Sequence, residues 1–436
     1  MNIYSAYSVK IKHYSRIFAD TIQIYRSAVD FLINVCVAEW DTLSKEGSYL
    51  YQQKYVENLI HSTKNHTALY AFDDLYYKFP SYLRRSAIME AIGKVSSYQS
   101  NLKNWMDSPI GKKPSCPKAG YIYPCLYKEV MYQPTGTYSA KIKCYVRNTW
   151  DWLYIDLRKS DVDYITHHCS DRRQCPPTLM KRGKEWFLDF SFEEKVKLTE
   201  TPVKEQTVLA VDLGINNACT ISIMHSDGTI LGRRFLSLPR EQDSLMHNIN
   251  RIKKAQQHGN HRTPRLWAKA KGTNNDISVK TAAFIIETAK EYHADVIVFE
   301  HLEKGKASGS KKQKLHLWRS QYVQQMVTDK AHRLGMRISH INARNTSRLA
   351  YDGSGYVERG IDGNYSICRF QSGKIYHCDL SASYNIGARY FIREILKSLS
   401  ETVRLQLEAK VPQACKRSTC TFSTLISLNA ELKAIA

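Results

Sequence analysis

The chain has 436 residues, which is enough for two to four domains with their own hydrophobic cores. Its 63 lysines and arginines outnumber its 41 acidic residues and give a formal net charge of +22. This charge favours a polyanionic partner. The sequence shows no amphipathic cluster that would bind lipid, so we expect nucleic acid rather than a membrane surface. The sequence shows no signal-peptide pattern and no apolar run of membrane-spanning length, which predicts a cytoplasmic protein. Eleven scattered cysteines exclude a secreted disulfide framework.

The first hundred residues read as one strand followed by helices. Residues 2–13 alternate loosely between apolar and polar, and residues 16–38 and 51–63 place apolar residues at helical steps. A third helix is predicted from Pro80 to Trp105, with Arg84 and Arg85 at the start of its polar side. Two interpretations of these arginines stay open: a solvated surface, or contacts to phosphates or base edges.

The pattern changes after a loop rich in proline and glycine at 108–126. Residues 140–146, 152–157 and 186–192 alternate with aromatic residues, which indicates an antiparallel barrel or sheet. The first strand is expected to join it, so that residues 16–107 form a helical insertion into a β domain. His167, His168, Cys169 and Cys175 do not have the spacing of a common zinc site.

Two short apolar runs in the second half each end on a carboxylate. Residues 208–211 lead into Asp212, and residues 296–299 lead into Glu300. Both runs are typical of strands buried on both faces. Strands at 220–224 and 229–235 follow the first run and predict an antiparallel meander. Asp379 lies in the first turn of a later predicted helix. Taken alone, Asp212 is equally well explained as a turn residue.

Together, the three acids predict a metal site. Acids at the ends of neighbouring strands, and one on a helix packed beside them, would meet at one edge of a mixed sheet. Carboxylates held together share protons or bind cations, and oxygen ligands select Mg²⁺ or Mn²⁺. Two such ions about 4 Å apart activate a water and stabilise the leaving oxygen in phosphodiester hydrolysis. The ordered set Asp212, Glu300 and Asp379 therefore indicates the ribonuclease H-like class, with these residues as catalytic metal ligands.

Basic residues gather in two further stretches, at 251–271 and at 304–312. A solvated helix face is one interpretation of the first stretch. Because it contains no acids to pair these charges, tracking of phosphates is at least as well supported. The candidate nucleic-acid contacts in the two stretches are Arg251, Lys253, Lys254, Arg262, Arg265, Lys269, Lys304, Lys311 and Lys312. Between and beyond them we expect helices at 277–292 and 315–334, a strand at 336–341 and an irregular, glycine-rich segment at 346–374.

The three acidic motifs resemble the split motifs of a RuvC nuclease domain. They read Asp212-Leu213-Gly214, Phe299-Glu300 and Asp379-Leu380-Ser381-Ala382. More broadly, the chain resembles the TnpB (OrfB) family of transposon-encoded RNA-guided nucleases, which are related to miniature type V CRISPR effectors. Residues 80–88, 181–190, 345–347 and 388–390 also resemble segments of that family.

The resemblance implies a multidomain α+β fold. An N-terminal β-barrel wedge domain would span 1–15 and 108–203, with a helical recognition domain at 16–107 inserted into it. A ribonuclease H-like RuvC α/β domain would span 204–345 and 376–400. A degenerate zinc-ribbon-like insertion that binds target nucleic acid would occupy 346–375, and a helical tail would occupy 401–436.

The same resemblance implies an RNA-guided DNA endonuclease. It would bind a guide RNA, recognise a short flanking motif and cut guide-complementary double-stranded DNA, displacing a single strand. Mg²⁺ or Mn²⁺, as two ions, would be held by the three acids. The alternatives are a repressor-like RNA-guided protein that binds DNA without cutting, and a transposase that joins DNA ends without RNA. The presence of all three acids favours cleavage.

Two features depart from the family pattern. Relatives usually carry two Cys-x-x-Cys pairs between the second and third acids, but here only Cys368 remains, with Cys378 nearby. Two thiolates are too few for a tetrahedral site, so no zinc is expected. Ser381 stands where relatives usually have asparagine; because the acid itself is kept, we expect activity to survive.

Overall fold

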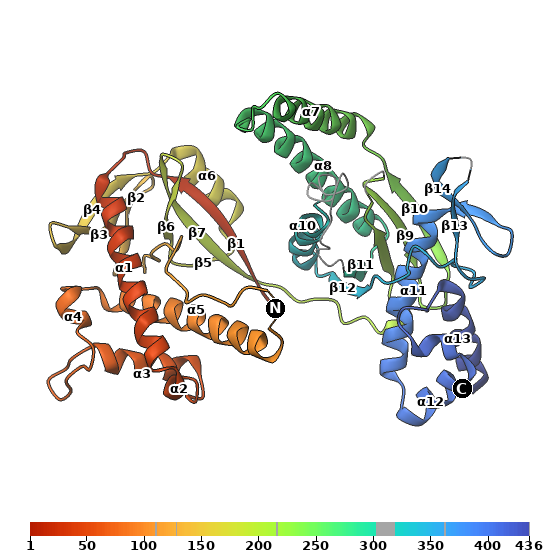
Figure 1. Ribbon diagram of the computed structural model, residues 1–436, viewed down its shortest axis with the longest axis horizontal. Coiled ribbons are helices and arrows are strands. Elements are labelled where there is room, and N and C mark those ends of the chain that lie inside the picture. Colours follow the sequence, from red (N-terminus) through yellow and green to blue (C-terminus); the bar gives the residue numbers. More distant parts are fainter. Residues whose placement is uncertain (110, 128, 215–216, 302–318, 362, 436) are drawn as a thin grey trace. The chain divides into compact units, whose positions relative to one another are not determined.

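The computed structural model describes residues 1–109, 111–127, 129–214, 217–301, 319–361 and 363–435. The chain divides into two compact units, one of residues Asn2–Glu194 and one of Met1 with Lys195–Ala436 (Figure 1). In the described part of the chain, no helix is long and apolar enough to cross a membrane.

The first unit contains a helical part built around two long helices. α1 (Arg16–Ala38) packs against α5 (Ser81–Asp107), and α3 (Tyr49–Ile60) packs against α5. The short helices α2 (Trp40–Leu43) and α4 (Phe72–Leu75) complete this part. The Ser15 side chain accepts a hydrogen bond of 3.2 Å from the Ile17 N–H and thereby caps α1. Phe18, Tyr25 and Leu32 are fully buried, so the predicted helical spacing does face a core.

The strands of this unit form two sheets. One contains β1 (Asn2–Lys10), β7 (Glu185–Lys195) and β5 (Arg173–Gln174) in that order, with β6 (Thr178–Arg182) also paired to β7. The other is the antiparallel meander β2 (Tyr132–Gly136), β3 (Ser139–Val146) and β4 (Thr149–Asp156). The first strand therefore joins the later strands, as predicted. The predicted barrel is not found as a closed ring among the described strands: Ile11 and Leu157 form one isolated bridge between the sheets. α6 (Lys159–His168) follows β4.

The second unit is built on a mixed five-stranded sheet with the order β10-β9-β8-β11-β12. β8 (Val208–Asp212), β9 (Cys219–Met224) and β10 (Ile230–Leu236) form the predicted meander. β11 (Val296–His301) pairs parallel with β8, and β12 (Arg337–Asn342) pairs parallel with β11. A short 3-10 turn, η1 (Val203–Glu205), precedes the sheet.

Helices cover both faces of this sheet (Figure 1). On one face, Leu209 and Val211 pack with residues of α8 (Pro264–Glu291) and α10 (Ser320–Arg333), and α7 (Pro239–Gln257) packs on α8. On the other face, Val208 and Ala210 pack with α11 (Cys378–Ser398) and α13 (Phe422–Ile435). The remaining C-terminal elements are α12 (Glu401–Lys410) and the 3-10 turn η2 (Pro412–Cys415). The first four residues of the helix predicted at 315–334 lie outside the described residues.

The segment expected to be irregular at 346–374 contains most of a small antiparallel sheet. Its strands are β13 (Glu358–Ile361), β14 (Asn364–Arg369) and β15 (Ile375–His377). The sequence prediction was wrong here because Cys368 is the only fully buried residue of β14, which leaves no alternation for a strand pattern to show. Gly360 and Gly373 adopt positive φ angles of 80° and 83° in this segment, which glycine accepts without strain.

Candidate active site

The first two acids are brought together by strand pairing. In the parallel pair β8 and β11, Val211 lies opposite Phe299, so Asp212 and Glu300 follow at the same edge of the sheet. Side chains alternate along a strand, and Ala210 belongs to the core under α11. Asp212 and Glu300 therefore lie on the face of the sheet that α11 covers.

The third acid comes from the start of α11. The His377 side chain accepts a hydrogen bond from the Leu380 N–H and caps the helix, so that Asp379 falls in its first turn. α11 packs directly on β8, which brings Asp379 to the edge where Asp212 lies. The structure thus unites three acids that are far apart in the sequence.

The carboxylates of Glu300 and Asp379 lie near enough to Asp212 to affect its ionisation. Burial raises the pKa of Asp212 well above its usual range, and the charges of Glu300 and Asp379 raise it further, while Arg359 opposes this. Burial also raises the pKa of Glu300, although a hydrogen bond from Thr346 and the charge of Arg389 lower it. Mutual repulsion of this kind is relieved by a bound cation or by a proton.

The three carboxylates supply oxygen donors of the kind that a hard divalent cation prefers. Two of them, Asp379 and Glu300, accept hydrogen bonds from protein side chains. Asn217 Nδ2 donates to Asp379 Oδ2 at 3.2 Å, and the Thr346 hydroxyl donates to Glu300 Oε1. Within the described ranges, no three acidic, cysteine or histidine side chains have the geometry of a formed metal site. Carboxylate oxygens are the ligands that Mg²⁺ and Mn²⁺ prefer, so Asp212, Glu300 and Asp379 have the chemistry to hold such an ion.

Two buried polar residues of α11 hold the segment that carries Thr346. Asn385 Nδ2 donates to the carbonyl oxygens of Thr346 (3.0 Å) and Leu349 (2.9 Å). Arg389 is only 5% exposed and donates to the carbonyl oxygens of Asn342 (2.7 Å) and Arg344 (2.8 Å). Sequence reasoning missed both residues. The available signal was their place in the run 384–392, where all other residues are apolar, aromatic or glycine and a polar side chain must find partners.

Ser381 has a structural role in this unit. It is 2% exposed, and its hydroxyl oxygen accepts a hydrogen bond of 3.2 Å from the Tyr351 N–H. Its side chain is committed to the backbone and is not directed at a metal ligand. Cys368 and Cys378 are both buried in a small cluster with Ala350 and Phe370.

The arginine pair at the start of α5 requires a correction. The Arg84 side chain is 7% exposed and lies 3.0 Å from Glu57 and 3.8 Å from Asp73. A buried guanidinium held by two acids is not available to a phosphate, so the nucleic-acid role predicted for Arg84 is not supported. Arg85 is 49% exposed and 3.3 Å from the second oxygen of Glu57.

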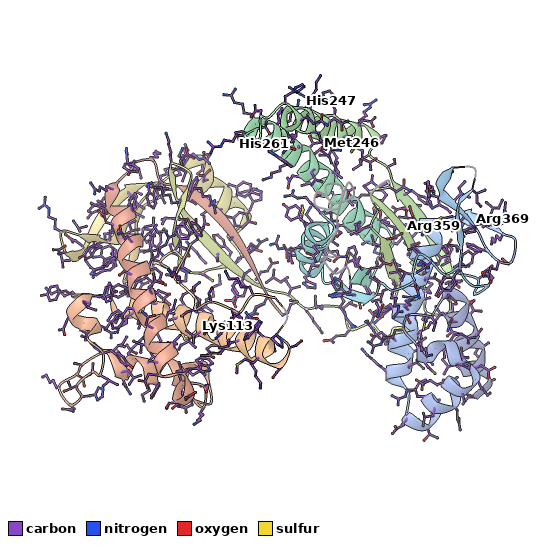
Figure 2. All side chains as sticks on the ribbon, in the orientation of Figure 1. Lys113, Met246, His247, His261, Arg359 and Arg369 are labelled. Atoms are coloured by element: carbon purple, nitrogen blue, oxygen red, sulfur yellow. The ribbon has the colours of Figure 1, made fainter. Side chains whose placement is uncertain are left out.

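The basic stretch 251–271 lies on α7, α8 and their connection, where Figure 2 labels His261. Its predicted contacts are exposed and form no salt bridge with another described residue. They are Arg251, Lys253, Lys254, Arg262, Arg265 and Lys269. The other three candidates, Lys304, Lys311 and Lys312, lie outside the described residues.

Comparison with known proteins supports the predicted resemblance. The model of the Aq_aa04 family matches residues 5–146. The TnpB-like protein aq_aa05 of Aquifex aeolicus (strain VF5) is 28% identical over 236 residues, covering 48% of this chain and 74% of the relative. Among solved structures, the Cas12f1–sgRNA–target DNA complex aligns with 85% of this chain and 81% of its own chain, at 13% identity and a TM-score of 0.53. The chain is therefore similar to a TnpB-like protein and shares the fold of Cas12f1.

Proposed function

We propose that the protein is an RNA-guided DNA endonuclease that cuts guide-complementary DNA by metal-dependent phosphodiester hydrolysis. The observation that carries this proposal is the meeting of Asp212, Glu300 and Asp379 at one sheet edge, close enough to raise the pKa of Asp212. A relative named TnpB-like and a shared fold with a protein solved with sgRNA and target DNA support the same activity.

In this proposal, the three acids hold the divalent cations, as one or two Mg²⁺ or Mn²⁺ ions. The ions supply an activated water and stabilise the leaving oxygen. Asn217 orients Asp379, and Thr346 orients Glu300. Partial burial keeps bulk water from the carboxylates, which strengthens their attraction for a cation.

The rest of the chain would bind the nucleic acids. The exposed cations of α7 and α8 are proposed to contact the phosphates of the guide RNA, the target duplex or the displaced strand. The first unit, together with residue 1 and residues 195–203, is proposed to form the wedge domain (1–15 and 108–203) and the recognition domain (16–107), which read the guide and a short flanking motif. The nuclease domain would be 204–345 with 376–400, followed by the tail 401–436. The sheet at 346–375 would bind target nucleic acid without zinc.

Replacing one acid tests the proposal. Asp212→Asn keeps the shape of the side chain and removes a charged metal ligand. We expect the cleavage rate of a matched DNA duplex, measured with guide RNA and Mg²⁺, to fall by about 10³-fold, equivalent to about 4 kcal/mol. Guide binding should be unchanged, and EDTA should abolish cleavage by the wild-type protein.

Asp227→Asn is the matched control, since Asp227 lies in the turn between β9 and β10 of the same sheet and accepts hydrogen bonds from Thr229. This control should cut at the wild-type rate. Cleavage by Asp212→Asn at that rate would refute the assignment. Guided binding without any cleavage by the wild type would indicate a repressor-like protein, and joining of DNA ends without RNA would indicate a transposase.

A further inference from the structure

A positively charged pocket lies in the second unit, away from the three acids. It has a volume of about 270 Å³ and is formed by the end of β12, by α11 and α12, and by the chain around η2. Ile392 and Leu396 contribute apolar surface. The charged side chains that line it are five basic residues and one acid, namely Arg389, Arg393, Lys397, Arg404, Arg417 and Glu408.

The pocket has more basic side chains than it has acidic side chains to pair with them. Arg393 and Lys397 share a single carboxylate, Glu394, at 2.7 Å and 3.3 Å. Arg417 is exposed and makes no salt bridge with any residue that the structure describes. Surplus charge in a concave site attracts an anion.

Arg404 adds an unsatisfied donor. Its guanidinium group is no closer than 3.8 Å to Glu401 and 3.9 Å to Glu408, which is too far for a hydrogen bond. Its Nε atom is buried and has no hydrogen-bond partner among the described residues. The Arg404 side chain as a whole is 43% exposed, so an acceptor that enters the pocket can reach its guanidinium group and pair with it.

The pocket lies near the edge of the sheet that carries the acids. β12 pairs with β11 so that Ile341, which lines the pocket, is opposite Glu300. α11 connects the two places, since it begins beside Asp379 and reaches the pocket at Arg389 and Arg393. At about 1.5 Å per helical residue, Arg393 is roughly 20 Å along the helix from Asp379.

We propose that this pocket binds a backbone phosphate of the DNA strand that passes the carboxylate cluster, a few nucleotides from the bond that is cut. Every phosphate of the strand carries a negative charge, so positive side chains that flank the cut site help to hold it. The pocket is smaller than most small-molecule sites, which favours one phosphate and its sugar over a whole cofactor. A DNA strand is favoured over the guide RNA because α11 carries both Asp379 and the pocket. This inference rests on the proposed function.

The test measures DNA binding separately from cleavage. The full chain with its guide RNA is mixed with a labelled matched duplex in EDTA, and the Kd is followed by anisotropy between about 50 and 300 mM salt. We expect the double variant Arg404→Ala/Arg417→Ala to raise the Kd about tenfold and to lower the slope of log Kd against log salt by about 1 to 2. The double variant with lysine at both positions should stay within about twofold of wild type.

Lys416→Ala is the matched control, because Lys416 is exposed beside Arg417 and does not line the pocket. It should leave Kd and slope unchanged. An unchanged Kd in the alanine double variant would overturn the inference, as would an equal loss of guide RNA binding. Inorganic phosphate that binds tightly without competing with DNA would also overturn it. DNA binding is measured in EDTA, and cleavage is measured separately in Mg²⁺. A wild type that binds matched DNA but does not cut it in Mg²⁺ would refute the endonuclease, while the Kd values would still test the pocket.

Discussion

At the scale of single residues, position in the fold decides what a charged side chain does. Arg84 and Arg85 are neighbours in the sequence and share Glu57, yet their side chains are 7% and 49% exposed. The local pattern shows two arginines on a polar helix face. Only the packing of α3 against α5 reveals that one of them is a buried ion-pair partner.

Arg84→Ala is expected to destabilise the first unit. It removes the main partner of Glu57, whose side chain is only 17% exposed, and leaves a carboxylate that is poorly solvated. Loss of one partner of a buried pair typically costs several kcal/mol. Because Arg85 still contacts Glu57, we expect about 2–3 kcal/mol less free energy of unfolding, measured by urea denaturation.

Arg85→Ala serves as its control and should cost less than about 1 kcal/mol, as expected for an exposed pair. If Arg84→Ala instead left stability unchanged and weakened RNA or DNA binding, the structural role assigned to Arg84 would be wrong.

At the scale of elements, the small sheet β13-β14-β15 is held by an apolar core. Phe370 is 2% exposed and packs against Tyr351, with ring centroids 5.5 Å apart, and against Tyr376 at 5.9 Å. Cys368 and Cys378 join this cluster as small buried residues. The cluster offers a source of stability that requires no metal.

Phe370→Ala should therefore unfold this segment preferentially. Truncation of a buried phenylalanine costs about 3–5 kcal/mol, so we expect faster proteolysis within residues 346–377 and a lower melting temperature. Tyr365→Ala, on the same sheet but 73% exposed, should change stability by less than about 0.5 kcal/mol. Stoichiometric zinc in the purified protein, with loss of the segment on chelation, would contradict this account.

At the scale of the whole molecule, the net charge of +22 favours a polyanionic partner, and the fold determines which basic side chains are available to that partner. Lysines on α7 and α8 differ in whether a neighbouring acid neutralises their charge. Lys253 and Lys254 are exposed and make no salt bridge with a described residue. Lys280 lies 2.6 Å from Glu241 and 2.8 Å from Asp276. Only the unpaired lysines have their full charge available to phosphates.

Lys253→Gln/Lys254→Gln is expected to weaken nucleic-acid binding and to lower its salt dependence. Each lost phosphate contact should reduce the slope of log Kd against log salt by about 1, measured by anisotropy with guide RNA or duplex DNA. Lys280→Gln removes a charge of the same kind that is already neutralised, so its slope should match wild type. Equal effects of the two variants would show that total charge alone controls binding.

The sequence by itself determined the elements with strong local patterns. The apolar runs before Asp212 and Glu300 identified two central strands, and the meander that follows Asp212 was predicted from its turn and its alternation. The order and types of the three acids predicted a metal site, which stays a prediction, and together with other segments led to the TnpB resemblance. The strands and the meander were accessible because each depends on residues close together in the chain.

Tertiary structure alone decided which distant residues meet. It placed Asp212 beside Glu300 through the pairing of β8 with β11, buried Arg84, and positioned Asn385 and Arg389 to hold the segment that contacts Glu300. It also formed a sheet where the sequence pattern predicted an irregular segment. The physical reason is that burial, pKa and pairing depend on neighbours brought together by folding, and a local pattern of residue types carries no information about those neighbours.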